Sequence, residues 1–190
     1  MTADSPSRSE SRAAVRVLGV DPGSRAAGWA VVSFEGPPHL VAAGVLRPPT
    51  STSFAERLRA LHDGLLAVAA RERPDEAAVE RVFSGVNPQS LITLGEARGV
   101  LLLALARAAL PVHEVTPAEI KKTVTGTGQA DKEQVRRMVL ALLGAGGTRL
   151  ALDAADAAAA ALTHGFRTAA GRRATRSGTG SPAVRPRVAG

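Results

Sequence analysis

The chain lacks several residue types that would widen its chemistry. Its 190 residues include no Cys, no Tyr, one Trp and four Phe. Without Cys there are no disulfides and no thiolate metal sites, and the reducing cytoplasm is the expected location. The first twelve residues, MTADSPSRSESR, have no apolar core of a signal peptide, and no charge-free apolar run approaches the roughly 18 residues of a membrane span. A membrane protein is therefore not expected.

The basic charge is distributed unevenly along the chain. Of the net charge of +7, most comes from residues 165–190, which hold six arginines and no acid, whereas residues 15–164 hold 16 basic and 15 acidic side chains. Residues 1–14 are polar and without apolar periodicity. We therefore predict a disordered extension at 1–14, one folded domain at 15–167 and a disordered basic tail at 168–190.

Apolar periodicity and turn residues predict an α/β domain with a five-stranded mixed sheet. The first three strands follow one another through short turns and should form an antiparallel meander, and the last two should run parallel to the first strand. The expected strands are 15–20, 28–34, 40–46, 75–80 and 112–115. The expected helices are 54–70, 89–109, 117–124, 132–143 and 150–163.

Asp153 and Asp156 open the last predicted helix, three positions apart and hence on one face. Arg149 is the basic residue nearest to them in sequence. Two acids in a first turn can simply complement the helix dipole, which is worth roughly 0.3–1 kcal/mol each. The alternative is that the two acids belong to an active site. That interpretation requires other acids of the chain to lie at the same place in the fold.

Asp21 and Glu80 are the acids that could join them, because each ends an apolar strand. Functional groups of α/β sheets gather at such carboxyl ends, although a solvated strand end is the simpler explanation for either acid alone. Four clustered carboxylates repel one another, by roughly 4 kcal/mol per pair about 4 Å apart at an effective dielectric of 20. Oxygen ligands without Cys or a His pair indicate Mg²⁺ or Mn²⁺, and two such ions could hydrolyse a phosphodiester.

Six short motifs in order resemble those of the RuvC family of Holliday-junction resolvases. They are Val20-Asp-Pro-Gly23, Val79-Glu-Arg-Val-Phe83, Gly95-Glu-Ala-Arg-Gly99, Lys121-Lys-Thr-Val-Thr-Gly126, Gly128-Gln-Ala-Asp-Lys132 and Asp153-Ala-Ala-Asp156 with Leu162-Thr-His164. The resemblance spans about residues 15–166. It implies a ribonuclease-H-like fold, a homodimer, and Mg²⁺-dependent paired nicking of four-way DNA junctions in recombination and repair. The resemblance also implies that the protein acts together with the RuvA and RuvB branch-migration proteins.

By position, the resemblance assigns the catalytic, metal-binding role to Asp21, Glu80, Asp153 and Asp156, where some family members have His in place of Asp153. It assigns DNA binding to Lys121 and Lys132, and Lys122 beside them is a further candidate. The alternative for these lysines is a solvated helix face. Phe83 matches a residue expected to stack on an unpaired base, and its alternative is an ordinary core aromatic.

Other residues have structural interpretations. We expect His164 to end the last helix, where an imidazolium complements the dipole, and His113 and Trp29 to be packed in the fold. The apolar helix at 89–109, with Gly95 and Gly99, is a candidate subunit contact.

Three alternative functions compete with the resolvase. Asp21-Pro-Gly-Ser followed by Gly28 also resembles the first phosphate loop of actin-like sugar kinases, but 190 residues cannot supply their second lobe. A junction-binding protein without chemistry is disfavoured because all four acids are present. A nuclease of the same fold acting on RNA or flaps is separated from a resolvase only by the substrates that it cleaves.

Overall fold

A five-stranded sheet forms the centre of the computed structural model, which describes residues 15–81, 87–146 and 149–177, with side chains up to 168. The strands are β1 Arg16–Asp21, β2 Ala27–Ser33, β3 His39–Leu46, β4 Glu76–Glu80 and β5 Val112–Val115. Their order is β3-β2-β1-β4-β5. β1 pairs antiparallel with β2 and parallel with β4, and β5 is parallel to β4. The predicted meander and parallel pair are confirmed.

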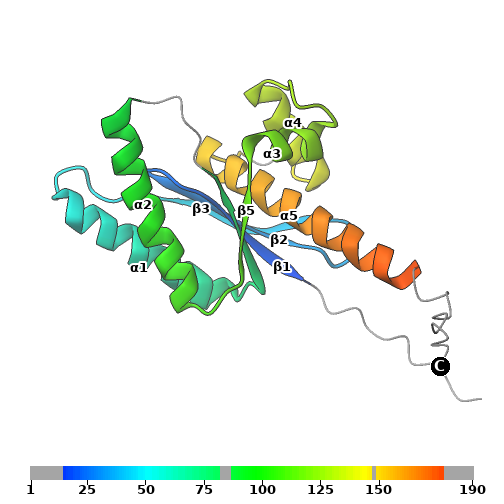
Figure 1. Cartoon of the computed structure of the whole chain (residues 1–190), viewed down its shortest axis with the longest axis horizontal. Helices are drawn as coiled ribbons and strands as arrows, with labels where there is room; N and C mark the ends of the chain where they lie inside the picture. The colour runs from blue at the N-terminus through cyan, green and yellow to red at the C-terminus, as the bar shows by residue number, and fades with distance from the viewer. Residues whose placement is uncertain (1–14, 82–86, 147–148, 178–190) are drawn as a thin grey trace, which may run out of the picture.

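The five helices divide between the two faces of this sheet (Figure 1). α1 (Phe54–Glu72) and α2 (Pro88–Arg107) cover one face, and α3 (Pro117–Thr125), α4 (Lys132–Leu142) and α5 (Leu152–Ser177) cover the other. The alternation of the strands explains this division, since Leu18 and Val20 pack with the first pair of helices whereas Val17 packs with the second group. Trp29 is buried in the core, as predicted.

The helices begin where their capping residues predict. Ser53 and Glu56 form a capping box at α1, Thr116 and Glu119 form another at α3, and Asn87 and Asp131 accept backbone N–H groups at α2 and α4. α1 ends at Glu72, and the next residue, Arg73, caps it in a left-handed conformation with φ of 48° immediately before Pro74.

α5 lies unusually close to the sheet because small residues face each other. Residues 157–161 of the helix are all buried alanines, and a Cβ added at Gly19 of β1 would lie 1.9 Å from the Ala157 carbonyl oxygen. At Gly28 of β2 an added Cβ would lie 1.9 Å from the Asp153 carbonyl oxygen. Glycine at these two positions therefore lets the first turn of α5 rest directly on the strands.

The predicted end of the last helix is wrong. α5 continues through His164 and Gly165 to Ser177, so the expectation that His164 complements a helix C-terminus fails. His164 lies mid-helix with its side chain 1 % exposed, and a Cβ at Gly165 would collide with the Phe34 ring, so tertiary packing carries the helix past a residue that is typical of helix ends. The backbone of 168–177 is likewise helical rather than irregular. The division into domain and tail stays a prediction.

Candidate active site

The candidate acids come from three separate parts of the chain. Asp21 is the last residue of β1, Glu80 is the last residue of β4, and Asp156 lies in the first turns of α5. Because β1 and β4 are parallel neighbours, both strands present their carboxyl ends at the same edge of the sheet. The close packing of α5 on Gly28 and Gly19 brings its acids over that edge.

A cavity of about 540 Å³ opens at this edge. Its wall includes Asp21, Glu80 and Asp156 together with Lys121 of α3 and Lys132 of α4. Five of the eight sequence-predicted site residues are thus brought together by the fold. Apolar groups, among them Leu94 of α2 and Ile120 of α3, complete the wall.

The remaining three predicted residues are placed differently. Asp153 stands one turn before Asp156, outside the lining of the cavity, although its charge still acts on Asp21. Lys122 is exposed on α3, also outside the cavity lining. Phe83 lies outside the described residues, so its role remains a prediction.

The electrostatics of the cavity oppose ionisation of its acids. Burial, followed by the charges of Glu80, Asp156 and Asp153, raises the pKa of Asp21 to about 7, and Lys132 acts in the opposite direction. Burial and Asp156 raise the pKa of Glu80 as well. Ionising these acids therefore costs free energy, first because they are buried and then because they repel one another, and a bound cation would offset that cost.

Two cations that are distant in sequence pair with the acids of α5. Lys132 Nζ lies 2.8 Å from Asp156 Oδ2, and Arg47 Nη2, just after β3, lies 3.6 Å from Asp153 Oδ2. The bond to Asp156 raises the pKa of Lys132. The acids of α5 have few basic residues near them in the sequence, but the fold brings counter-charges to them from distant segments.

Sequence reasoning missed two residues of this site, Arg47 and Arg81. Arg81 follows Glu80 directly inside a motif already singled out, and its side chain lines the cavity. Its position next to a strand-end acid was the available signal. Arg47 carried no comparable signal, since only the pairing of β3 with β2 brings it near Asp153.

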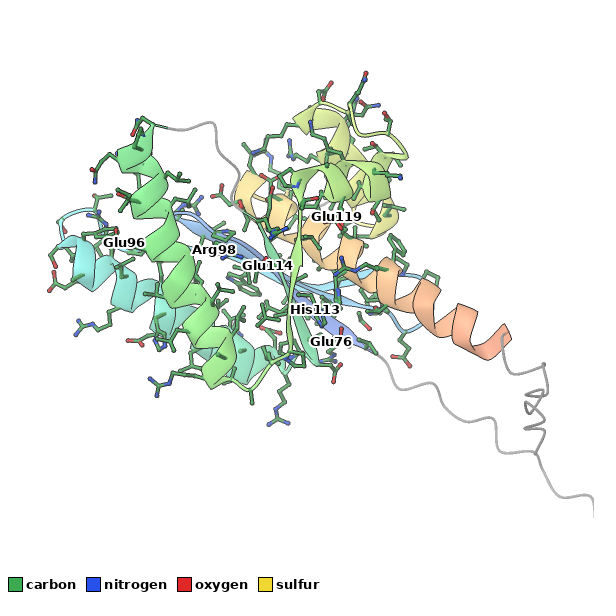
Figure 2. All side chains as sticks on the ribbon, in the orientation of Figure 1. Glu76, Glu96, Arg98, His113, Glu114 and Glu119 are labelled. Atoms are coloured by element: carbon green, nitrogen blue, oxygen red, sulfur yellow. The ribbon has the colours of Figure 1, made fainter. Side chains whose placement is uncertain are left out.

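A second group of metal-ligand side chains is separate from these acids. Atoms of Glu76, His113 and His164 lie within 4.8 Å of one another. Glu76 begins β4 whereas Glu80 ends it, so the group lies about 13 Å along the strand from the cavity. Figure 2 shows Glu76 and His113 together, away from the end of the strands near α3.

The contacts of this group favour a hydrogen-bond chain over a metal site. Arg167 can only donate, so its Nη2, 3.2 Å away, makes His164 Nδ1 an acceptor, and the Nε2–H then donates to Glu76 at 2.5 Å. The His113 and His164 rings are stacked with centroids 4.0 Å apart and planes inclined by 17°. Ring-nitrogen lone pairs lie in the ring plane, so stacked rings cannot both direct them at one ion. His113 was predicted to be packed, and its ring stacks on His164 while its side chain is 39 % exposed.

The RuvC family model, described as crossover junction endodeoxyribonuclease RuvC, matches residues 17–164. The chain belongs to the RuvC family. A RuvC of Azorhizobium caulinodans is 49 % identical over 151 residues, which cover 79 % of this chain and 89 % of that protein.

Solved RuvC structures give the same assignment. The Thermus thermophilus RuvC structure matches with a TM-score of 0.76 and 34 % identity, covering 83 % of this chain and 97 % of that one. T. thermophilus RuvC in complex with a Holliday junction substrate matches with a TM-score of 0.78 and 33 % identity, covering 83 % and 96 %. The predicted ribonuclease-H-like fold is confirmed, and membership of the RuvC family leaves no place for the sugar-kinase alternative.

Proposed function

We propose that this RuvC-family chain is a Mg²⁺-dependent endodeoxyribonuclease that resolves four-way DNA junctions by paired nicks in opposing strands during recombination and repair. The observation that carries the proposal is the cavity at the end of β1 and β4. Acids from three segments line it together with two lysines, in a chain whose relatives are crossover junction endodeoxyribonucleases.

The donor set fits hard divalent cations. The candidate ligands are the carboxylates of Asp21, Glu80, Asp153 and Asp156, all oxygen donors, as Mg²⁺ and Mn²⁺ prefer. The pKa of Asp21 is raised first by burial and then by the neighbouring carboxylates, a cost of ionisation that such ions would offset. When two Mg²⁺ ions are bound, they lower the pKa of a water molecule and stabilise the leaving oxygen of a phosphodiester.

The protein's own part is to hold the strand against these acids. Lys121 and Lys132 flank the carboxylates in the cavity wall and are the groups that would bind phosphates on either side of the cut. Lys132 is paired with Asp156, and its side chain would be released to bind a DNA phosphate if that carboxylate held a cation. Lys122 would contact DNA outside the cavity, and Phe83 would stack on an unpaired base at the crossover.

A homodimer is part of the proposal, and α2 is its candidate contact. Ile92 and Leu103 are 57 % and 54 % exposed on this helix. A Cβ added at Gly99, between them in sequence, would meet no atom within 4 Å, so a second helix could approach closely there. A two-fold contact would place two active sites symmetrically, as two opposing nicks require.

α2 also has the length and apolar composition of a membrane-spanning helix. One such helix is weak evidence for a membrane, and this one packs Ala97, Leu101 and Leu105 against the sheet layer and contains Glu96 and Arg98. A subunit contact accounts for its apolar exposed side. Family resemblance further supports cytoplasmic location and cooperation with RuvA and RuvB.

The test is cleavage of a synthetic four-way junction with each strand labelled in turn. In Mg²⁺ the full chain should nick two opposing strands, and chelation should abolish nicking. The Asp21→Asn variant should bind the junction without nicking it, whereas Asp63→Asn, an exposed acid of α1, should cleave like the wild type. If Asp21→Asn nicks at the wild-type rate, the metal-site proposal is wrong.

The same assay distinguishes the alternative functions. We expect linear duplex, flap and RNA–DNA hybrid to be cleaved far more slowly than the junction. Preferred cleavage of a flap or hybrid would identify a nuclease of the same fold with a different substrate. Binding without nicking by the wild type in Mg²⁺ or Mn²⁺ would identify a junction-binding protein.

A further inference from the structure

Arg81 stands at the border between the acid-lined cavity and a second hollow. Besides lining the cavity with Asp21 and Glu80, it lines a groove of about 370 Å³. The other residues of the groove are Leu91, Gly95 and Arg98 of α2 and Glu114 of β5. A DNA strand that leaves the cavity toward α2 would therefore pass over Arg81.

The side chain of Arg81 is held in a defined direction. Its backbone N–H donates to the Val115 carbonyl oxygen at 2.8 Å, and its Nε lies 3.0 Å from Glu114 Oε2 in an ion pair. The other carboxylate oxygen of Glu114 accepts from Arg98, whose side chain is 19 % exposed. Figure 2 shows Arg98 and Glu114 facing each other between α2 and β5.

The arrangement leaves binding capacity on the exposed side of the guanidinium. Glu114 approaches Arg81 at Nε, which leaves the donors of the two Nη groups for another partner, and the Arg81 side chain is 55 % exposed. Two guanidinium groups share one carboxylate, so the three residues together carry a net charge of +1. A planar guanidinium fixed in this way matches the oxygens of a phosphate.

We propose that Arg81 binds a backbone phosphate of the DNA strand where it leaves the cavity toward α2, and that Glu114, held by Arg98, is the positioning residue for Arg81. This inference rests on the proposed nuclease function and adds a phosphate contact to it. It also makes Glu114 an acid that promotes binding to a polyanion.

An ordinary surface ion pair would behave differently. Such pairs contribute about 0–1 kcal/mol to stability, and removing an acid beside DNA should strengthen DNA binding through simple charge effects. If Glu114 positions Arg81, replacing it with Gln should instead weaken binding. The sign of this single change separates the two possibilities.

The experiment measures junction affinity as a function of KCl concentration in full-length protein carrying Asp21→Asn, so that Mg²⁺ can be present without cleavage. Adding Arg81→Gln should weaken binding roughly tenfold at low salt. It should also reduce the slope of log affinity against log salt by about 0.9, the value for one phosphate contact. Arg81→Lys should keep that slope.

The control is Arg107→Gln, at the far end of α2 and exposed, which should leave the slope unchanged. Adding Glu114→Gln should weaken binding several-fold without lowering the melting temperature by more than a few degrees. An unchanged slope for Arg81→Gln would overturn the phosphate contact, and tighter binding by Glu114→Gln would overturn the positioning role. Failure of the wild-type chain to cleave the junction at all would count against the proposed function itself.

Discussion

Asp21 is an acid whose surroundings oppose its ionisation. The pKa rises from 3.8 in an unfolded chain to about 7 in the folded protein, mainly through burial and secondarily through Glu80, Asp156 and Asp153. Between pH 4 and pH 7 the folded state keeps a proton that the unfolded state has lost. The free energy of unfolding contributed by this group therefore falls as pH rises through that window, by at most about 4 kcal/mol.

The direction of this pH dependence can be measured by urea unfolding from pH 5 to pH 8 in the presence of a chelator. Asp21→Asn should be more stable than the wild type at pH 8, and the difference should shrink toward pH 5. Mg²⁺ should raise the stability of the wild type at pH 8 more than that of the variant, because binding to the folded state is coupled to folding. Parallel stability curves for the two proteins would contradict this account of Asp21.

His164 gives the opposite dependence on pH. Burial is the main cause that lowers its pKa, although the bond to Glu76 acts against it. If this histidine stays neutral in the folded state, the protein loses stability as pH falls below about 6.5, because the histidine of the unfolded chain takes up a proton there.

His164→Gln should flatten this loss between pH 6.5 and pH 5. It should also cost about 1–3 kcal/mol near pH 7.5, since Glu76 and Arg167 lose a buried partner. The exposed His39→Gln serves as control and should change neither quantity. Urea unfolding at several pH values is the measurement, and an unchanged acid limb in His164→Gln would refute the assignment.

At the scale of elements, α5 is the part of the fold on which the site depends. Its alanines and the facing glycines let the helix axis lie near the strands, and Leu162 and His164 fill the core farther along. The acids of the first turns are thereby fixed relative to the ends of β1 and β4. The positions of these acids are well defined because the buried part of α5 is packed along the sheet.

Gly28→Ala tests this dependence. The new methyl group would lie 1.9 Å from the Asp153 carbonyl oxygen, so the first turn of α5 would have to move away from β2. We expect a loss of about 1–3 kcal/mol in stability, typical of overpacking, and a disproportionate fall in the nicking rate under conditions where the protein is folded. Gly146→Ala, at an exposed and open position, is the control. Wild-type nicking by a fully folded Gly28→Ala variant would show that the helix need not sit so close.

At the scale of the whole molecule, the proposed homodimer would set the arrangement of the two active sites. Ile92→Glu combined with Leu103→Glu should convert the protein to a monomer in sedimentation experiments without a large change in melting temperature, because both side chains are more than half exposed. The variant should nick single strands of a cruciform plasmid and give nicked circles, where the wild type gives linear product. Val41→Glu, at an exposed apolar position of β3, is the matched control. A dimeric double variant would place the subunit contact elsewhere.

Local patterns sufficed for the elements whose signals lie within the element. Capping boxes at Ser53 and Thr116 and the first-position prolines 88 and 117 fixed the helix starts, and strand alternation fixed both faces of the sheet. The prediction of where α5 ends was wrong because glycine, here Gly165, is typical of a helix terminus. Its lack of a side chain instead accommodates the Phe34 ring, a contact made across the fold.

The sequence by itself determined the family, the topology and the four candidate acids, because these are written in short motifs and in periodicity along the chain. Only the tertiary structure decided which charges meet. Lys132 pairs with Asp156, Arg47 with Asp153, and Arg81 with Glu114, each across gaps of more than twenty residues. Charge interactions act through distance in space and burial, and a linear sequence specifies neither until the sheet and α5 are packed together.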